Sequence, residues 1–163
     1  MQTERGAVLK RRTKLVALAL LITGVDQLTK LLVVRAVPEN ESHPLIDHFL
    51  WLSHFRNSGV AFGKLRGFPG VLALVALVGV IAFMTITVRE PGRWGGIGAA
   101  IVAGGALGNL IDRLARGSVV DFVDLHWWPA FNVADSAITI GAIVIILAGF
   151  FDKKPSHDTA DSS

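Results

Sequence analysis

The sequence predicts an all-α membrane protein with four transmembrane helices, and three observations lead to this fold class. The chain of 163 residues is 52% hydrophobic and only 18% charged, whereas soluble domains carry about 25% charged residues. Its mean hydropathy is +0.53. Four long apolar runs follow one another along the chain, with basic residues at their ends. We therefore expect a single membrane-embedded domain over residues 15–151, preceded by a basic segment at 1–14 and followed by a disordered tail at 152–163.

Each apolar run is long enough to cross a bilayer as a helix. A helix rises about 1.5 Å per residue and the hydrocarbon core is about 30 Å thick, so roughly 20 residues suffice. The predicted helices cover residues 15–37, 69–88, 95–115 and 133–151. The third is the least apolar, and its Gly104, Gly105 and Gly108 suit close contact between helices.

The first helix has an alternative interpretation. Lys10–Lys14 followed by Leu15–Val25 is similar to the charged region and apolar core of a cleavable signal peptide. No cleavage site with small residues follows, and the polar residues Asp26 to Lys30 lead into a further apolar stretch. We therefore expect a retained helix.

Basic residues lie mainly on one side of the four runs. Nine of the sixteen Lys and Arg residues fall there: Arg5, Lys10, Arg11, Arg12, Lys14, Arg89, Arg93, Lys153 and Lys154. The positive-inside rule makes that side cytoplasmic. Both termini are then expected inside, and the segments 38–68 and 116–132 outside.

Composition excludes several classes of function. The net charge is +3 and the pI about 9.7, but the basic residues form no single stripe, so no nucleic-acid partner is expected. Cysteine is absent, which excludes disulfides, thiolate metal sites and a cysteine nucleophile. The five histidines form no recognisable ligand motif. We expect no metal and no other cofactor.

The first outer segment is more than a bare connection. Residues 45–63 are rich in aromatic and aliphatic side chains, and Asn57-Ser58-Gly59 is a turn signal within them. We expect short strands that fold over the membrane surface.

Two sets of polar residues interrupt the apolar runs, and ionisable groups inside a bilayer are candidates for function. Asp26 and Lys30 are four residues apart and share a helix face. They are expected to form a mutually neutralising pair that faces the bundle, although Lys30 alternatively extends outward to the membrane surface. Asn109, Asp112 and Arg113 share a face at the end of the third helix, where we expect a structural cluster of polar groups rather than direct chemistry.

Asp121 and Asp135 are the candidates for chemistry. Asp121 follows the third helix in an apolar, β-branched stretch, and Asp135 lies at the start of the fourth, so both belong to the same membrane face. Two carboxyl groups at one site tend to share a proton. The ionised one can take a proton from water while the protonated one polarises a peptide carbonyl, which is the pairing that peptide hydrolysis needs.

Structural alternatives exist for both acids. Asn132 is a good helix cap, and an acid three residues later is favoured by capping geometry and by the helix dipole. Asp121 alternatively forms an ion pair with Arg113 or Arg116. Asp124 is a further candidate that spacing alone does not exclude. Residue chemistry by itself leaves these possibilities open.

Five short strings in the chain are more specific. They are Asp26-Gln27-Leu28-Thr29-Lys30, Asn57-Ser58-Gly59-Val60-Ala61-Phe62-Gly63, Gly104-Gly105-Ala106-Leu107-Gly108-Asn109-Leu110-Ile111-Asp112-Arg113, Val119-Val120-Asp121-Phe122 and Phe131-Asn132-Val133-Ala134-Asp135-Ser136. With these strings, in this order over about residues 15–150, the chain resembles the lipoprotein signal peptidases (signal peptidase II), a family of bacterial aspartic peptidases.

The resemblance implies a catalytic dyad on Asp121 and Asp135. It also implies residues that support the site or bind substrate: Asp26, Asn57, Asn109, Arg113 and Asn132. Asp26 and Asn109 would organise the site, whereas Asn57 and Arg113 would contact substrate or stabilise the fold around it. Asp112 would be structural. Lys30 matches a family position to which the sequence assigns no role.

The same resemblance implies the setting of the reaction. The 45–63 segment would correspond to a small extracytoplasmic β-cradle that cups the substrate. That substrate would be a diacylglyceryl-modified prolipoprotein, cleaved just before its lipidated cysteine in the bacterial inner membrane. The other expected partner is membrane lipid, and the enzyme is expected to be a monomer.

A different class of function competes with this one. Asp26, Lys30, Asn109 and Asp112 would also suit a polar path in a small proton- or ion-coupled transporter. Transport sites usually lie near the bilayer midplane on broken helices, whereas most polar residues of this chain gather towards one face. A third possibility is a membrane scaffold whose polar residues only lock the helices together. Cleavage of a lipid-modified precursor by the purified protein discriminates among all three.

Overall fold

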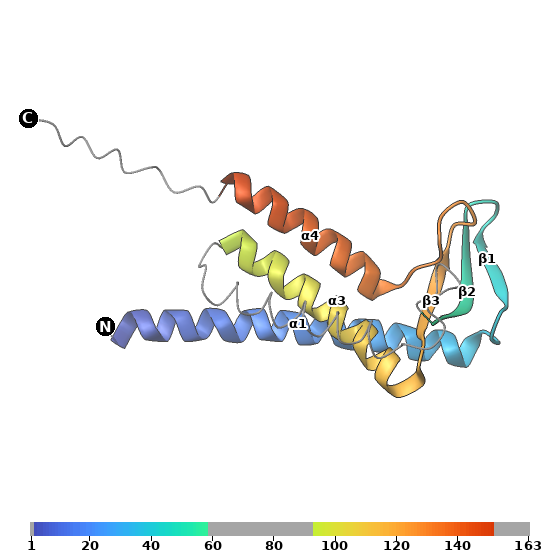
Figure 1. The fold of residues 1–163 in the computed structure, drawn as a ribbon, viewed down its shortest axis with the longest axis horizontal. Coiled ribbons are helices and arrows are strands. Elements are labelled where there is room, and N and C mark those ends of the chain that lie inside the picture. The colour runs from blue at the N-terminus through green and yellow to red at the C-terminus, as the bar shows by residue number, and fades with distance from the viewer. Residues whose placement is uncertain (1, 59–92, 152–163) are drawn as a thin grey trace, which may run out of the picture.

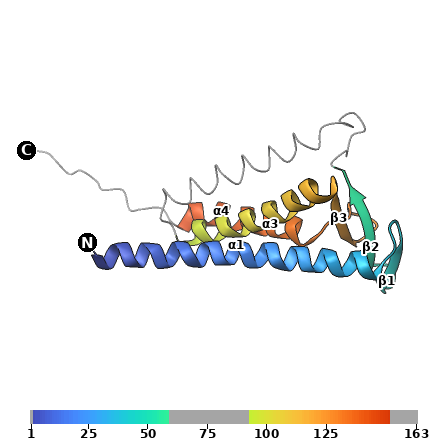
Figure 2. The same cartoon turned by 90° about the horizontal axis from the view of Figure 1, so that it is seen from below.

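The computed structural model describes residues 2–58 and 93–151. Its elements are α1 (Gln2–Ala36), β1 (Ser42–Ile46), β2 (Leu50–Asn57), α3 (Arg93–Arg116), β3 (Val119–Asp124) and α4 (Val133–Phe151). The helix α3 packs against both α1 and α4. The strands lie across one end of the helices, far from the N-terminus (Figures 1 and 2). We refer to this end as the sheet end.

Three helices of the described residues are long and apolar enough to cross a membrane. These spans are Arg5–Ala36, Trp94–Arg116 and Val133–Phe150. The predicted helix at 69–88 lies outside the described residues, as does the tail at 152–163. A mostly helical fold with long apolar helices and a small sheet is therefore confirmed, while the number of four transmembrane helices stays a prediction.

The first helix begins earlier than its apolar run. It starts at Gln2, whereas hydrophobicity alone predicts a start at residue 15. Its 35 residues span about 52 Å, well beyond the roughly 30 Å of a hydrocarbon core. The basic residues before Leu15 continue the helix although they are not apolar, because Lys and Arg are themselves favourable in helices. α3 and α4 lie within two residues of their predicted limits.

Small residues allow the helices to approach closely. A Cβ atom added at Gly104 would lie 2.6 Å from the carbonyl oxygen of Ala19 in α1. One added at Gly105, on the other side of α3, would collide with the carbonyl oxygen of Ala134 in α4. Ala19, Ala100 and Ala103 form a buried cluster between α1 and α3. The glycines and alanines of α3 thus make it the shared packing surface of the described helices.

The distribution of side chains is inverted relative to a soluble protein. Large apolar side chains point outward from α4: Ile140, Ile143, Ile146, Leu147 and Phe150. Asp26, Lys30 and Asp112 are completely buried near the sheet end. Lipid explains the exposed apolar surface, and mutual pairing explains the buried charges.

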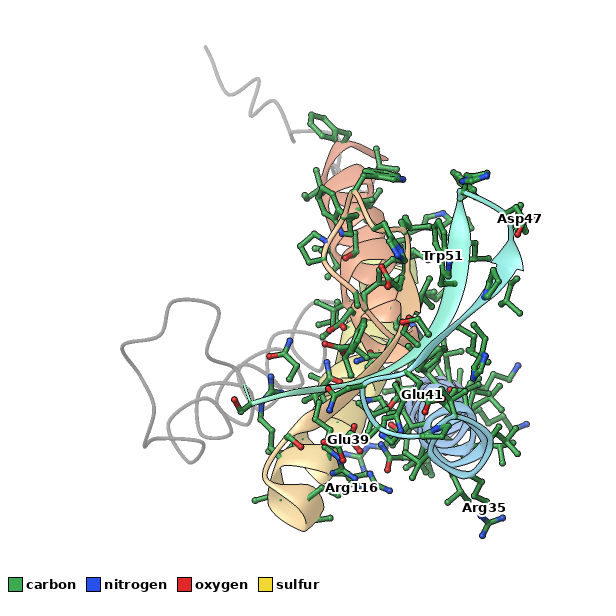
Figure 3. The ribbon with its side chains drawn as sticks, turned by 90° about the vertical axis from the view of Figure 1, so that its right-hand side faces the viewer. Arg35, Glu39, Glu41, Asp47, Trp51 and Arg116 are labelled. Atoms are coloured by element: carbon green, nitrogen blue, oxygen red, sulfur yellow. The ribbon has the colours of Figure 1, made fainter. Side chains whose placement is uncertain are left out.

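The sheet has the order β1-β2-β3 and is antiparallel throughout. β1 and β2 form a hairpin, and β3 joins it from a distant part of the chain, with Asp121 opposite Phe55 and Asn57 opposite Val119. Figure 3 looks onto this end, with Asp47 at the tip of the hairpin and Arg35 at the end of α1. The hairpin begins three residues before the predicted segment 45–63, and β2 ends at Asn57, at the predicted turn.

Candidate active site

Asp121 is held in the middle of β3 by two amide groups. Asp121 is only 3% exposed. Asn57 Nδ2 donates a hydrogen bond to Asp121 Oδ2 (3.0 Å), and Asn132 Nδ2 donates one to Asp121 Oδ1 (2.7 Å). Asn57 reaches this position because β2 pairs with β3. Both oxygens of Asp121 therefore accept N–H donors, one from the sheet and one from the start of α4.

Burial raises the pKa of Asp121 from 3.8 to about 6. Loss of water around a carboxylate disfavours its charged form. The nearby charge of Asp135 raises the pKa further, whereas the hydrogen bonds from Asn57 and Asn132 lower it. Asp121 is thus a carboxyl group that takes up a proton unusually close to neutral pH, next to a second acid.

Asp135 lies in the first turn of α4, and the expected capping geometry is confirmed. The Asp135 N–H donates to Asn132 Oδ1 (3.0 Å), and the Asn132 N–H donates to Asp135 Oδ2 (3.3 Å). This reciprocal pair is a capping box. Asn109 Nδ2 in α3 donates to the remaining oxygen, Asp135 Oδ1 (2.8 Å). The carboxyl group is therefore oriented by its own helix start and by a neighbouring helix.

The two acids meet at Asn132. Its amide nitrogen binds Asp121, while its backbone N–H binds Asp135. The alternative ion pair of Asp121 with an arginine is wrong, because Arg116 pairs with Asp112 and Arg113 Nη1 donates to the carbonyl oxygen of Asn109 (3.3 Å). The two carboxyl groups therefore share a neighbour, and the charge of Asp135 contributes to the raised pKa of Asp121.

Asn109 connects this pair to a cluster of charged and polar groups between α1 and α3, which we call the polar network and which consists of Asp26, Gln27, Lys30, Asn109, Asp112 and Arg116. All are buried except Gln27, which is half-buried, and Arg116, which is exposed. The predicted pair of Asp26 and Lys30 is confirmed, with Lys30 Nζ 2.8 Å from Asp26 Oδ2. The alternative that Lys30 extends outward is wrong, because its side chain is 0% exposed. Lys30 Nζ also lies 2.9 Å from Asp112 Oδ2. Asp26 Oδ1 accepts the N–H of Ala134 (2.9 Å), which ties α1 to the start of α4.

Two members of the polar network are not predicted from the sequence. Gln27 Nε2 donates to Asp26 Oδ2 (3.2 Å), Asp112 Oδ1 (3.2 Å) and the carbonyl oxygen of Gly108 (3.0 Å). Arg116 at the end of α3 (Figure 3) pairs with Asp112 one helical turn earlier. The four-residue spacing of Asp112 and Arg116 carries a signal that could have identified this pair. Gln27 gives no such local signal, because its partners lie mostly on another helix.

Asp124 lies apart from the pair of acids. Ser53 Oγ donates to Asp124 Oδ2 (3.2 Å), and the His126 N–H donates to Asp124 Oδ1 (2.8 Å). These partners belong to the sheet and to the loop that follows β3. Neither is a partner of Asp121 or Asp135, so Asp124 is a suitable control for experiments on the two acids.

An apolar cavity of about 370 Å³ opens beside Asp135. Its walls are Trp128, Phe131, Asp135, Ser136, Thr139 and Ile140. The side of α4 that lines it continues into the exposed apolar surface at Ile140 and Ile143. Among the described residues, the cavity is therefore continuous with the exposed apolar face of α4.

Comparison with known proteins adds independent information. The family model described as signal peptidase (SPase) II matches residues 18–151. A protein of Shouchella clausii named lipoprotein signal peptidase is 46% identical over 132 residues, covering 79% of this chain and 87% of its own length. One of the same name from Syntrophotalea carbinolica is 43% identical and covers 85% and 91%.

The fold is similar to solved structures as well. A bacterial membrane enzyme solved by the in meso method at 1.9 Å resolution superposes with a TM-score of 0.80 at 32% identity, over 86% of this chain and 95% of that one. A second such enzyme, at 2.3 Å resolution, gives a TM-score of 0.78 at 30% identity over 93% and 94%. The described helices and sheet therefore match an experimentally determined membrane-enzyme fold.

Proposed function

The chain belongs to the signal peptidase II family of proteases, and on that premise we propose that it is an intramembrane aspartic endopeptidase of the bacterial inner membrane. Its reaction is removal of the signal peptide from diacylglyceryl-modified prolipoproteins, by cleavage just before the lipidated cysteine. One observation carries the proposal: two carboxyl groups, Asp121 and Asp135, come from separate elements at the sheet end and bind the same residue, Asn132. This is the arrangement that a water-activating dyad needs.

In the proposed mechanism Asp121 and Asp135 hold one proton between them. The ionised carboxylate takes a proton from a water molecule, and the oxygen of that water attacks the scissile carbonyl carbon. The protonated carboxyl group donates to the carbonyl oxygen, which stabilises the tetrahedral intermediate. Collapse of that intermediate breaks the C–N bond, and a carboxyl proton passes to the leaving amine. Asp121 is the natural carrier of the shared proton, because burial raises its pKa to about 6.

The supporting residues have separate tasks in this mechanism. Asn57 and Asn132 orient Asp121, and Asn109 and Asn132 orient Asp135. Asp26 fixes the start of α4 through the N–H of Ala134. Arg113 braces α3 beside Asn109 and is available to contact substrate.

The cavity beside Asp135 supports a lipid-borne substrate. Its lining by Trp128, Phe131 and Ile140 is apolar apart from Asp135 and two hydroxyl side chains. A signal peptide is itself an apolar helix, so it can enter laterally from the bilayer. Its acyl chains then hold the scissile bond near the membrane surface, where water is available.

The proposed topology places the sheet end outside the cytoplasm and both termini inside. It rests on the basic residues between Arg5 and Lys14, which lie at the end of α1 away from the sheet. Single cysteines introduced at Ser42 and at Ser156 of this cysteine-free chain should react with impermeant thiol reagents from opposite sides of the membrane. Labelling of both from the same side would contradict the four-helix topology.

Cleavage of a lipidated precursor by the purified protein tests the function itself. The wild-type protein should release the signal peptide, whereas the same precursor without diacylglycerol should be a poor substrate. Asp121→Asn and Asp135→Asn should each abolish cleavage, because asparagine is nearly isosteric but cannot act as a carboxylate base.

The matched control is Asp124→Asn, which removes a buried carboxyl group outside the pair and should retain activity. Chelators should leave the rate unchanged, since the proposed chemistry uses no metal. Near-normal turnover of either dyad variant, at equal amounts of folded protein, would end the mechanism. Absence of cleavage by the wild-type protein would instead reopen the transporter interpretation.

A further inference from the structure

We propose that Lys30 is a positioning residue of the active site, which orients the amide of Asn109 so that its N–H group faces Asp135. This inference rests on the proposed function and goes beyond it, since it assigns a role to a side chain that never reaches substrate. The fully buried ammonium group of Lys30 contacts two carboxylates and the side-chain oxygen of Asn109. The nitrogen of the same Asn109 amide binds Asp135.

The three donors of Lys30 match three acceptors around it. A lysine ammonium group has three N–H donors and no acceptor. Lys30 Nζ lies 2.8 Å from Asp26 Oδ2, 2.9 Å from Asp112 Oδ2 and 2.9 Å from Asn109 Oδ1. Each donor thus has one acceptor, and the side chain of Lys30 is 0% exposed. All three donors of Lys30 are therefore used within the polar network.

Lys30 also affects the orientation of the Asn109 amide. A primary amide can be turned by 180° so that its oxygen and nitrogen exchange places. Lys30 Nζ and Asn132 Nδ2 (3.3 Å) both direct donors at the same end of Asn109, so only an oxygen fits there. Its nitrogen must then face Asp135 Oδ1, 2.8 Å away. Without Lys30, the remaining donor at that end among the described residues is Asn132 Nδ2, at the longer distance of 3.3 Å, so the amide of Asn109 is held less firmly in the orientation that faces Asp135.

The same lysine is linked to Asp121 through Asp112. Asp112 Oδ2, which binds Lys30, also accepts the N–H of Val120 (3.3 Å), the residue before Asp121 in β3. The charges of Asp26 and Asp112 are balanced by Lys30 and Arg116. The lysine therefore contacts the supports of both acids while remaining outside the cavity itself.

The test compares Lys30→Met with the wild-type protein in the cleavage assay. Methionine keeps most of the side-chain volume and removes all three donors. A misplaced catalytic group can reduce the rate by on the order of 10²-fold, and we expect a loss of kcat of about that size with KM changed by less than about threefold. The matched control is Thr23→Val: Thr23 also joins α1 to α3, through the carbonyl oxygen of Gly104, but it does not touch the polar network. Thr23→Val should change the melting temperature without changing kcat.

A double-mutant cycle separates positioning from general support of the fold. If Lys30 acts through Asn109, then Lys30→Met should reduce kcat strongly in the wild-type background and by less than about threefold in the Asn109→Ala background. The loss of melting temperature should persist in both backgrounds. Equal losses of kcat in the two backgrounds would overturn the inference, as would full kcat in Lys30→Met.

A fallback keeps the inference testable if removal of the lysine alone prevents folding. The double variant Lys30→Met/Asp112→Asn removes one negative charge together with the positive charge of Lys30. The charges of Asp26 and Arg116 then still balance. The same double-mutant cycle is run with Asp112→Asn in place of the wild-type protein as the reference. The wild-type protein is assayed in parallel. Absence of cleavage by the wild type refutes the proposed function, whereas cleavage by the wild type and undiminished kcat in the lysine variants refute only this inference.

Discussion

Replacing Asp121 with asparagine should separate the stability of the site from its chemistry. The carboxyl group of Asp121 is buried, so its ionised form opposes folding. Asparagine has nearly the same shape and no charge. We expect Asp121→Asn to be inactive and, at pH 8, more stable than the wild-type protein.

The size of the effect follows from the pKa. Burial, as the largest cause, raises the pKa of Asp121 from 3.8 to about 6, and this difference corresponds to about 3 kcal/mol. The folded state binds the proton more tightly than the unfolded chain, so the wild-type protein loses stability as the pH rises from about 4 to above 6. Below that window Asp121 is protonated in both states, and the advantage of asparagine disappears.

Hydrogen bonding reduces the expected gain. Both neighbours of Asp121, Asn57 and Asn132, offer N–H donors, and asparagine can accept at only one of its two positions. Asn132 is fixed by the cap of α4, so its N–H donor keeps the oxygen of the new amide and the contact with Asn57 becomes the imperfect one. A loss of about 1 kcal/mol for an imperfect bond leaves a net gain of about 2 kcal/mol at pH 8.

Equilibrium unfolding in mixed detergent micelles, followed by tryptophan fluorescence, measures this difference. The free energy of unfolding of Asp121→Asn minus that of the wild type should rise from near or below zero at pH 4 to about 2 kcal/mol at pH 8. The subtraction removes contributions from other titrating groups that are common to both proteins. A difference that is constant from pH 4 to pH 8 would refute the assignment of a raised pKa to a buried Asp121.

Three further predictions concern the surroundings of the two acids. Asn132→Ala should lower the free energy of unfolding by about 2–4 kcal/mol, from a lost helix cap and a lost bond to a carboxylate, and abolish cleavage; Asn132→Ser should retain much of the stability but little activity, and equal melting temperatures for the two variants would contradict the capping role. Gly105→Ala should destabilise by about 1–3 kcal/mol and reduce kcat, because its Cβ would displace the backbone at Ala134, while Gly95→Ala, which meets no atom within 4 Å, should do neither. The pH profile of kcat/KM should contain an alkaline limb with a midpoint near 6, set by loss of the proton that the two acids share, because burial raises the pKa of Asp121 to about 6. Asp124→Asn should show the same limb, and a flat profile between pH 5 and 8 would contradict a shared proton.

Local signals explain which parts of the structure the sequence predicts well. The limits of α4 follow from a capping residue, Asn132, directly before an apolar run. The pair of Asp26 and Lys30 follows from their spacing of one helical turn. Both features depend on residues that are close in the chain, so a single sequence contains the information needed to find them.

Long-range contacts explain what the sequence does not reveal. The stretch Val119–Asp124 is β-branched, but its pairing with β2 joins residues more than 60 positions apart. Helical spacing predicts that Lys30 pairs with Asp26. It does not predict the contact of Lys30 with the Asn109 amide, because Asn109 belongs to another helix. The early start of α1 is hidden for a different reason, since basic first turns carry no apolar signal.

The capping and catalytic interpretations of Asp135 compete in the sequence but are compatible in the structure. A cap requires the Asn132 oxygen to accept the N–H of Asp135, and an amide whose oxygen is so engaged has only its nitrogen left to face Asp121. The contact that begins α4 therefore also determines which donor Asp121 receives. Lys30 and Asn132 impose a similar constraint on Asn109, because both direct donors at its amide oxygen. The amides of Asn132 and Asn109, each with a fixed orientation, thus hold the two acids that we propose for catalysis. The start of α4 fixes the amide of Asn132, and the buried Lys30 fixes that of Asn109. Both contacts also stabilise the fold.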